Sequence, residues 1–272
     1  MNTHRLPVFF LSHGGGPWPW MKEQTAGSYD QLEASLARLP SLLETVPKAV
    51  LMVSAHWEER EFTVMSNPRP GMIYDYSGFP EHTYRVKYEA PGSPAVAQRA
   101  QALISAAGID VRADPDRGFD HGTYSPLAVV YPAANVPTLQ LSLKHGLDAA
   151  QHLAVGRALA PLRDEGVLIV GGGLSYHDLR AFGSSGTEPS ATFDRWLQDS
   201  LVGSGSEERA AALMNWQAAP AARQAHPREE HLLPLMVAAG AAVDDMAHCV
   251  YHEDRFLGAI TVSSFQFGGA PH

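Results

Sequence analysis

The sequence predicts an α/β fold, a single domain in which a central, mostly parallel or mixed sheet is covered by helices on both faces. Short apolar runs typical of buried strands alternate along the chain with segments whose apolar residues recur at helical spacing. Glycine and proline lie at many of the junctions, where turns are expected. With 272 residues, of which 45% are hydrophobic and 18% charged, the chain can bury a full core.

The predicted strands are short apolar runs bounded by turn residues. In chain order they cover residues 6–13, 49–56, 109–111, 136–143 and 167–170. The last of these runs continues directly into Gly171-Gly172-Gly173. The alternating segment 248–267, which contains Gly258, predicts a hairpin near the end of the chain.

The predicted helices lie between these strands and show the period of a helix with one apolar face. In chain order they cover residues 32–43, 93–107, 148–165 and two or three segments of 190–242 that are separated near 203–206. Ser93-Pro94 and Asp148 are typical of helix starts, whereas Gly108 and Gly166 are typical of helix ends.

We expect one domain over residues 1–272, because no internal repeat or low-complexity linker divides the chain. The segment at about 66–94 is rich in Tyr, Pro and Gly and has little periodicity. It is therefore interpreted as a long, ordered loop insertion with a functional role.

Charge and cysteine content exclude several classes of protein. The chain carries 20 Lys and Arg against 29 Asp and Glu, a formal net charge of -9, and has no basic cluster, so neither nucleic acid nor an anionic membrane is expected as a partner. Cys249 is the only cysteine, which excludes an intrachain disulfide and a site built from several thiolates. Without any run of about 18 apolar residues, neither a signal peptide nor a membrane anchor is expected, and we predict a cytoplasmic location.

Two of the predicted strands end on a histidine that follows closely after a serine. His13 ends the run 6–13 and His56 ends the run 49–56. Open α/β sheets bind ligands beyond the carboxyl ends of their strands, and imidazole is the commonest metal ligand. Either histidine alone is more typical of a hydrogen-bonded core residue, but their matched placement indicates a metal site at one edge of the sheet.

The third candidate ligand comes from the segment His226-Pro-Arg-Glu-Glu-His231, whose proline and two glutamates are typical of a helix start. Five residues correspond to roughly 140° around a helix, so the two histidines cannot share one face. We expect His231, just past the first turn, to reach the sheet edge and His226 to line the mouth of the site. The two glutamates are interpreted as solvated residues of the helix N-terminus.

Two further histidines stand beside glycines. His177 follows the strand that ends in three glycines, and His121 lies between Gly118 and Gly122 in a predicted loop. Each could be an acid/base, a substrate contact or a capping residue, and sequence spacing alone does not rank these roles.

Competing chemistries lack their defining motifs. His-Gly-Gly-Gly also occurs in the oxyanion loops of esterases, but Gly173-Leu-Ser175-Tyr-His177 lacks the second glycine of a nucleophile elbow. The chain has neither a phosphate-binding loop nor the glycine pattern of a dinucleotide site. Serine hydrolase, NTPase and dinucleotide oxidoreductase are therefore disfavoured.

Taken together, these motifs resemble the LigB-type, class III extradiol ring-cleavage dioxygenases, and in particular their DOPA dioxygenase-like branch. The resemblance extends over nearly the whole chain. Its motifs are Ser-His13-Gly-Gly-Gly-Pro, Ser-Ala-His56-Trp, Tyr76-Ser-Gly-Phe-Pro, Tyr88-Glu-Ala-Pro-Gly-Ser-Pro, Asp120-His121-Gly, Gly-Gly-Leu-Ser-Tyr-His177-Asp-Leu and His226-Pro-Arg-Glu-Glu-His231.

The resemblance implies a role for several histidines of this chain. It implies that His13 and His56 are metal ligands, that His177 is the catalytic acid/base and that His121 is a second catalytic histidine close to the substrate. In the better known members the third ligand is a glutamate at the start of a late helix, whereas His231 occupies that position here. The family chemistry implies Fe(II) for activity, but three neutral imidazoles would also suit Zn(II) in the same site.

The implied partners are a catechol substrate, DOPA-like in this branch, and O2, with a muconic semialdehyde as product. Trp57, Tyr76, Phe79 and His226 are candidate walls of the substrate pocket, although core packing is at least as expected for the aromatic residues. Two alternatives stay open: a non-enzymatic LigB-like protein that binds a metal or a peptide, and a zinc-dependent hydrolase. The sequence leaves the oligomeric state undetermined.

Overall fold

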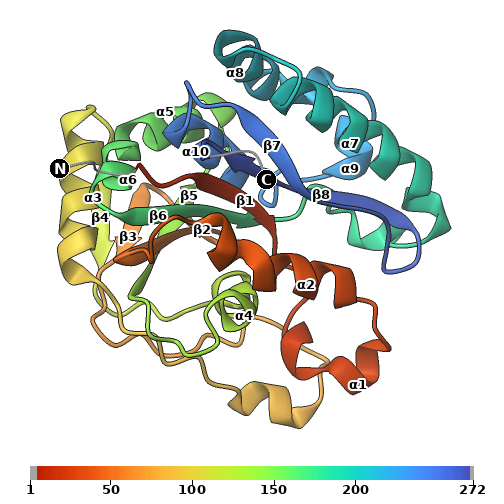
Figure 1. Cartoon of the computed structure of the whole chain (residues 1–272), viewed down its shortest axis with the longest axis horizontal. Coiled ribbons are helices and arrows are strands. Elements are labelled where there is room, and N and C mark those ends of the chain that lie inside the picture. The colour runs from red at the N-terminus through yellow and green to blue at the C-terminus, as the bar shows by residue number, and fades with distance from the viewer. Residues whose placement is uncertain (1–4, 270–272) are drawn as a thin grey trace.

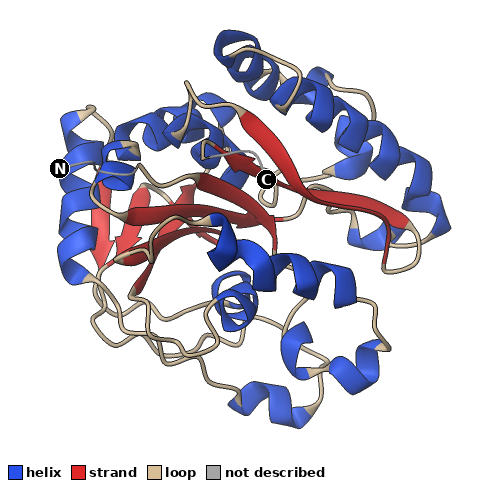
Figure 2. Ribbon diagram, in the orientation of Figure 1, coloured by secondary structure: helices blue, strands red, loops and turns tan. Residues whose placement is uncertain are grey.

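The structure is a computed structural model that describes residues 5–269. Its centre is an eight-stranded mixed sheet in the order β4-β3-β5-β2-β6-β1-β8-β7, with helices on both faces (Figures 1 and 2). The strands are β1 (Val8–Ser12), β2 (Ala49–Glu59), β3 (Phe62–Met65), β4 (Val111–Asp114), β5 (Thr138–Lys144), β6 (Val167–Gly173), β7 (Ala247–Phe256) and β8 (Ile260–Phe267). The predicted α/β fold and its mixed sheet are confirmed.

The helices mostly connect successive strands. The α-helices are α1 (Lys22–Thr25), α2 (Asp30–Arg38), α3 (Pro94–Ala106), α4 (His121–Val130), α5 (Ala149–Leu159), α6 (Pro161–Asp164), α7 (Thr187–Leu201), α8 (Ser206–Met214), α9 (Ala222–Ala225) and α10 (Leu233–Ala241). Short 3-10 helices are η1 (Trp18–Trp20), η2 (Leu39–Leu42), η3 (Glu81–Arg85), η4 (Leu179–Ala181), η5 (Ser184–Gly186) and η6 (Trp216–Ala218). Within residues 5–269, no helix combines the length and apolar character needed to cross a membrane.

Four adjacent strands, β5, β2, β6 and β1, run in the same direction. β1 and β2 each pair with β6 in parallel register, and β2 also pairs in parallel with β5. β8 joins antiparallel to β1 and forms a hairpin with β7. The carboxyl ends of β1, β6 and β2 therefore meet at one edge of the sheet.

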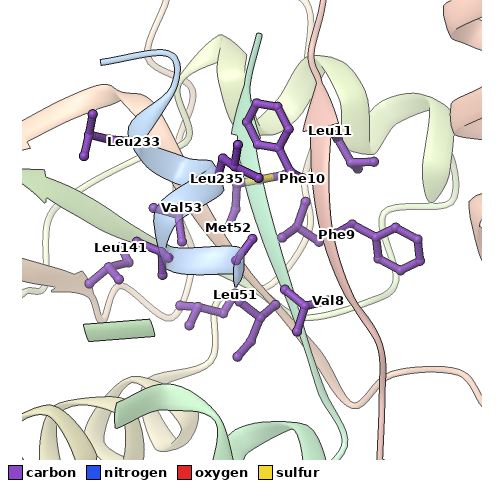
Figure 3. Close-up of a cluster of buried hydrophobic side chains, with 14 of the residues drawn as sticks. Val8, Phe9, Phe10, Leu11, Leu51, Met52, Val53, Leu141, Leu233 and Leu235 are labelled. Carbon is purple, nitrogen blue, oxygen red and sulfur yellow. The ribbon is translucent and has the colours of Figure 1, made fainter. Parts of the chain in front are cut away.

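A large part of the core lies between the sheet and α10, whose nine residues are all buried. Figure 3 shows Leu235 of this helix beside Phe10 and Met52 of the strands. α5 packs closely on α10 because Gly156 and Gly240 have no side chain; a Cβ on Gly156 would overlap the carbonyl of Val237. Burial of such apolar surface is the main force that holds α10 against the sheet.

Several predicted elements are confirmed, and others differ in the structure, including β3, which was not predicted. The terminal hairpin forms, and Asp148 caps α5 by accepting a hydrogen bond from the backbone N–H of Gln151. β6 continues through all three glycines instead of ending at Val170. The predicted loop at His121 is the first turn of α4, and the helix predicted from Pro227 begins only at Leu233.

We predict that His152 makes the stability of the fold depend on pH. Burial lowers its pKa from 6.5 to about 4. In the unfolded chain His152 is protonated below about pH 6.5, whereas in the folded chain it is protonated only below about pH 4. The free energy of unfolding therefore falls as the pH falls through this interval. For this group the loss is about 2 kcal/mol between pH 7 and pH 5.

Urea unfolding of the wild type and of a His152→Leu variant at both pH values measures this contribution. The variant should lose about 2 kcal/mol less than the wild type between pH 7 and pH 5. Equal losses in the two proteins would show that His152 does not carry this pH dependence.

Candidate metal centre and substrate cavity

Three histidines converge at the edge where β1, β6 and β2 end. His13 directly follows β1, His56 lies in the last part of β2, and His231 lies in the turn before α10. The Nε2 atoms of His13 and His56 are 3.2 Å apart, and those of His56 and His231 are 3.3 Å apart. We call these three residues the convergent histidines.

The outer nitrogens of two convergent histidines face hydrogen-bond acceptors. His13 Nδ1 lies 2.6 Å from the carbonyl oxygen of Gly14, and His231 Nδ1 lies 3.0 Å from Oε1 of Glu230. A carbonyl or carboxylate oxygen can only accept, so each Nδ1 carries the proton and donates it. The Nε2 atom of each ring is consequently the unprotonated nitrogen.

The third convergent histidine has the same orientation. His56 Nδ1 faces Asp75 Oδ2 at 3.5 Å, so its Nε2 lone pair also points at the other two. Three lone pairs directed at one point repel one another unless a cation lies between them. Nitrogens that share one metal at about 2.1 Å are roughly 3.0–3.4 Å apart, so the observed spacing fits a single transition-metal ion.

The convergent histidines remain neutral at physiological pH. Burial lowers the pKa of His13 to about 3, and burial together with the neighbouring histidines holds the pKa of His56 and His231 well below the usual value. Neutral imidazole is the form that binds a metal, so the site is prepared for binding without prior loss of protons.

His177 stacks on one of the convergent histidines. Its ring centroid is 3.4 Å from that of His231, with the two planes 17° apart. His177 Nδ1 lies 3.1 Å from Oε1 of Glu230, the same oxygen that faces His231. Burial alone would raise the pKa of Glu230, but the interactions with His177 and Arg228 outweigh it and keep the pKa below its usual value.

His121 has an equivalent carboxylate partner on the other side of the site. Its Nδ1 lies 2.9 Å from Oδ1 of Asp75, and its backbone N–H donates to the same oxygen. Asp120, which caps α4 and is fully buried, accepts hydrogen bonds from Ser54 and Gln140. These bonds fix the start of α4, and with it His121, against β2 and β5.

Glycines in β6 allow the turn that carries His231 to approach the sheet. A Cβ on Gly173 would overlap the carbonyl oxygen of His231, and a Cβ on Gly171 would overlap that of Pro234. The backbone N–H of Leu174 donates to the His231 carbonyl at 3.1 Å. The glycine run at the end of β6 therefore determines how deeply His231 is placed.

The convergent histidines form part of the wall of a cavity of about 650 Å³. His121, His177 and Phe79 also line it, together with Phe182 and Phe256. This volume and this mixture of aromatic and polar walls are typical of a site for a small molecule. Of the predicted pocket residues, Phe79 lies in the cavity wall.

The other three predicted pocket residues are not among those that line the cavity, and their role in substrate binding stays a prediction. His226 is fully buried behind it, with Nε2 3.0 Å from the carbonyl oxygen of Ser175. Trp57 points to the other side of β2, where Arg117 lies over its ring. Tyr76 lies behind His121, and its hydroxyl donates to the carbonyl of Thr83 at 2.6 Å.

Sequence reasoning did not identify Asp75 and Glu230 as site residues. Asp75 lies in the irregular segment after β3, where no periodicity marks it. Glu230 was interpreted as solvated, but its side chain is only 14% exposed. A carboxylate directly beside a proposed metal ligand is a signal that could have indicated it, because ligand histidines usually donate their second N–H to such a group.

Among residues 5–269, two groups have side-chain atoms close enough to hold a metal: His13 with His56 and His121, and His177 with Glu230 and His231. Both adjoin the same cavity. The fold and this histidine-rich cavity are those expected of a metal-dependent enzyme that acts on a small molecule.

Comparison with known proteins gives the family. Residues 5–265 match the family described as the catalytic LigB subunit of aromatic ring-opening dioxygenase. The chain therefore belongs to the LigB family and is an aromatic ring-opening dioxygenase by class, which confirms the predicted family and type of enzyme.

Individual relatives match this chain over nearly their whole length. The chain is 38% identical over 274 residues to a 4,5-DOPA dioxygenase extradiol of Beta vulgaris, covering 96% of each protein. It is 35% identical to a protein of the same name from Escherichia coli K12, covering 98% of this chain and 97% of the relative. A crystal structure of the uncharacterized protein JW3007 from Escherichia coli K12 superposes with a TM-score of 0.77 at 31% identity, covering 97% of this chain and 100% of that one.

We predict that Gly173→Ala destabilises the protein because the added methyl group displaces the His231 turn from β6. The expected loss is about 1–3 kcal/mol in the free energy of unfolding, measured by urea denaturation. Gly71→Ala is the matched control, since Gly71 lies outside helices and strands, has no positive φ, and a Cβ there would have no atom within 4 Å. Equal stability of the two variants would contradict the close approach described above.

Proposed function

We propose that the protein opens the ring of a catechol with O2, in an extradiol reaction, at one Fe(II) ion held by His13, His56 and His231. The observation that supports this ligand set is the convergence of three Nε2 lone pairs, with the Nε2 atom of His56 3.2 Å from that of His13 and 3.3 Å from that of His231. His121, whose ligand atom lies within 4.8 Å of those of His13 and His56, is the alternative third ligand. The names of the relatives support DOPA as the substrate class.

Bound Fe(II) would supply the redox chemistry that allows a catechol to react with O2. The aromatic walls of the cavity hold the flat ring of the substrate and limit the access of water. The carboxylates beside the convergent histidines hold the imidazoles in the orientation and tautomer that a metal requires.

His177 is the proposed acid/base. Glu230 accepts a hydrogen bond from His177 Nδ1–H, so His177 Nε2 is unprotonated and able to take the proton of a catechol hydroxyl. The same nitrogen can later return the proton to the product. His121, which Asp75 orients in an equivalent way, is proposed to contact the substrate on the opposite side of the site.

An all-histidine set would also bind Zn(II), and a three-histidine zinc site can activate water for hydrolysis. The LigB family favours the dioxygenase over this second candidate. We therefore propose that Zn(II) can occupy the site without supporting ring opening.

We predict that protein reconstituted anaerobically with Fe(II) converts L-DOPA or another catechol to a yellow semialdehyde once O2 is admitted. Zn(II)-loaded protein should be inactive, because Zn(II) has no redox chemistry. Absence of ring cleavage across a panel of catechols with verified iron would refute the proposal, and O2-independent hydrolysis by the Zn(II) form would favour the alternative.

We predict that His177→Ala retains the metal but lowers kcat by about 100-fold or more, as expected for loss of a general acid/base. His231→Ala should instead lose the metal, measured by metal analysis after dialysis. The exposed His145 provides the control, since His145→Ala should change neither property. Retention of metal by His231→Ala would remove that residue from the ligand set.

We predict that Glu230→Gln lowers kcat more than it raises KM. The amide oxygen can still accept a hydrogen bond, but the negative charge that stabilises protonated His177 is lost, and a loss of about 10–100-fold is typical for such partners of metal-site histidines. Steady-state kinetics at equal metal content measures the effect. An unchanged kcat would show that Glu230 does not support His177.

A further inference from the structure

An ion pair lies in the wall of the cavity, close to the convergent histidines. Glu58 is two residues beyond His56 on β2, and Arg228 lies in the segment before α10; both line the cavity. Arg228 Nη2 is 2.6 Å from Glu58 Oε1 and 2.7 Å from Oε2. The arginine side chain is 56% exposed and the glutamate side chain 22% exposed, so a molecule in the cavity can reach both.

The ion pair of Glu58 and Arg228 lies where a substituent on the ring of a bound catechol can reach it. Residues two apart on a strand point to the same side and are about 7 Å apart, and Glu58 stands in this relation to His56. Trp57, between them, points away from the cavity. A catechol whose oxygens lie at the convergent histidines can therefore direct a short side arm toward Glu58 and Arg228.

The other charged groups of the wall are already engaged with the histidines. Asp75 faces His56 and His121, and Glu230 faces His177 and His231 through Oε1, while its Oε2 lies 3.4 Å from Nη1 of Arg228. Among the cavity-lining residues that the structure describes, Arg228 is the one arginine or lysine. The pair is thus the part of the wall that offers both signs of charge to a substituent.

We propose that the Glu58–Arg228 pair, which we call the rim pair, is the subsite for the zwitterionic α-amino-acid group of a catechol substrate. Arg228 binds the carboxylate and Glu58 binds the ammonium group. This inference rests on the proposed ring-opening function and assigns the residues that select the substrate.

The chemistry of the two side chains suits this ligand. A guanidinium carries five N–H donors in a planar fork, so it can hold Glu58 and a second carboxylate together. A carboxylate has enough lone pairs to accept from both Arg228 and an ammonium group. A purely anionic arm would meet the repulsion of Glu58 and Glu230, and a purely cationic arm that of Arg228, whereas adjacent opposite charges match both partners.

The chain offers a matched control pair on the same strand. Arg112 Nη2 is 2.5 Å from Oε2 of Glu59, and its side chain is 55% exposed, almost the same as that of Arg228. Neither Arg112 nor Glu59 lines the cavity. Arg112→Met therefore removes an equivalent surface ion pair without changing the proposed subsite.

The test measures anaerobic binding to the Zn(II)-loaded protein by calorimetry, which does not depend on turnover. The four probes are L-DOPA, dopamine, 3-(3,4-dihydroxyphenyl)propionate and 4-methylcatechol. They present both charges, the ammonium alone, the carboxylate alone and neither. The wild type should bind L-DOPA at least about tenfold more tightly than 4-methylcatechol, the gain expected for charge-assisted hydrogen bonds.

Arg228→Met and Glu58→Gln should each reduce the ratio of the L-DOPA to the 4-methylcatechol affinity by about tenfold. Arg228→Met should weaken the propionate more than dopamine, Glu58→Gln should weaken dopamine more than the propionate, and Arg112→Met should keep the wild-type ratios. The 4-methylcatechol affinity of each variant reports whether its cavity is intact. Ratios unchanged in both rim-pair variants, or changed equally in Arg112→Met, would overturn the proposal.

The Fe(II)-loaded proteins, assayed with the same four catechols under O2, separate the two proposals. The ratio of kcat/KM for L-DOPA over 4-methylcatechol should fall in parallel with the affinity ratio, mainly through KM. Turnover of all four catechols with equal kcat/KM and equal binding affinity would overturn the rim-pair proposal but leave the proposed ring opening intact. Selective binding without any turnover would retain the rim pair and reject the proposed function.

Discussion

The site depends on one constraint: three buried imidazoles must present unprotonated nitrogens to the same point. The Nε2 atom of His56 lies 3.2 Å from that of His13 and 3.3 Å from that of His231, and the Nδ1 atom of each ring faces an acceptor. Because burial keeps these rings neutral, the lone pairs are available to a cation. The parallel pairing of β1, β6 and β2 supplies the shared edge, and the glycines of β6 admit the turn that carries His231.

Two carboxylates organise the histidines around this point. Asp75 lies between His56 and His121, while Glu230 lies between His231 and His177. Each carboxylate thus joins a convergent histidine to a histidine outside that group. A change at either carboxylate is expected to affect both the ligand set and the chemistry performed beside it, because the two depend on one acceptor.

The sequence predicted the fold class and five of the histidines that the structure brings together at the cavity, and the misses have physical causes. Strand-end histidines are visible as patterns because a buried strand is a short apolar run, and His13 and His56 follow from it. α4 was missed because Gly122 and Pro126 disfavour a helix, and only the tertiary bonds of Asp120 fix its start. A helix was predicted from Pro227 because the proline and two glutamates are typical of a helix start. The segment is instead a turn packed against the glycines of β6, a tertiary contact that no local signal contains. The burial of His226 and the position of Asp75 likewise result from tertiary packing, which no local pattern contains.

The most direct measurement of the central claim is an anomalous difference map from crystals of the metal-loaded protein, collected at the absorption edge of the bound metal. We predict one peak bonded to the Nε2 atoms of His13, His56 and His231, at about 2.1 Å from each. A peak held instead by His13, His56 and His121, or by His177, Glu230 and His231, would contradict it.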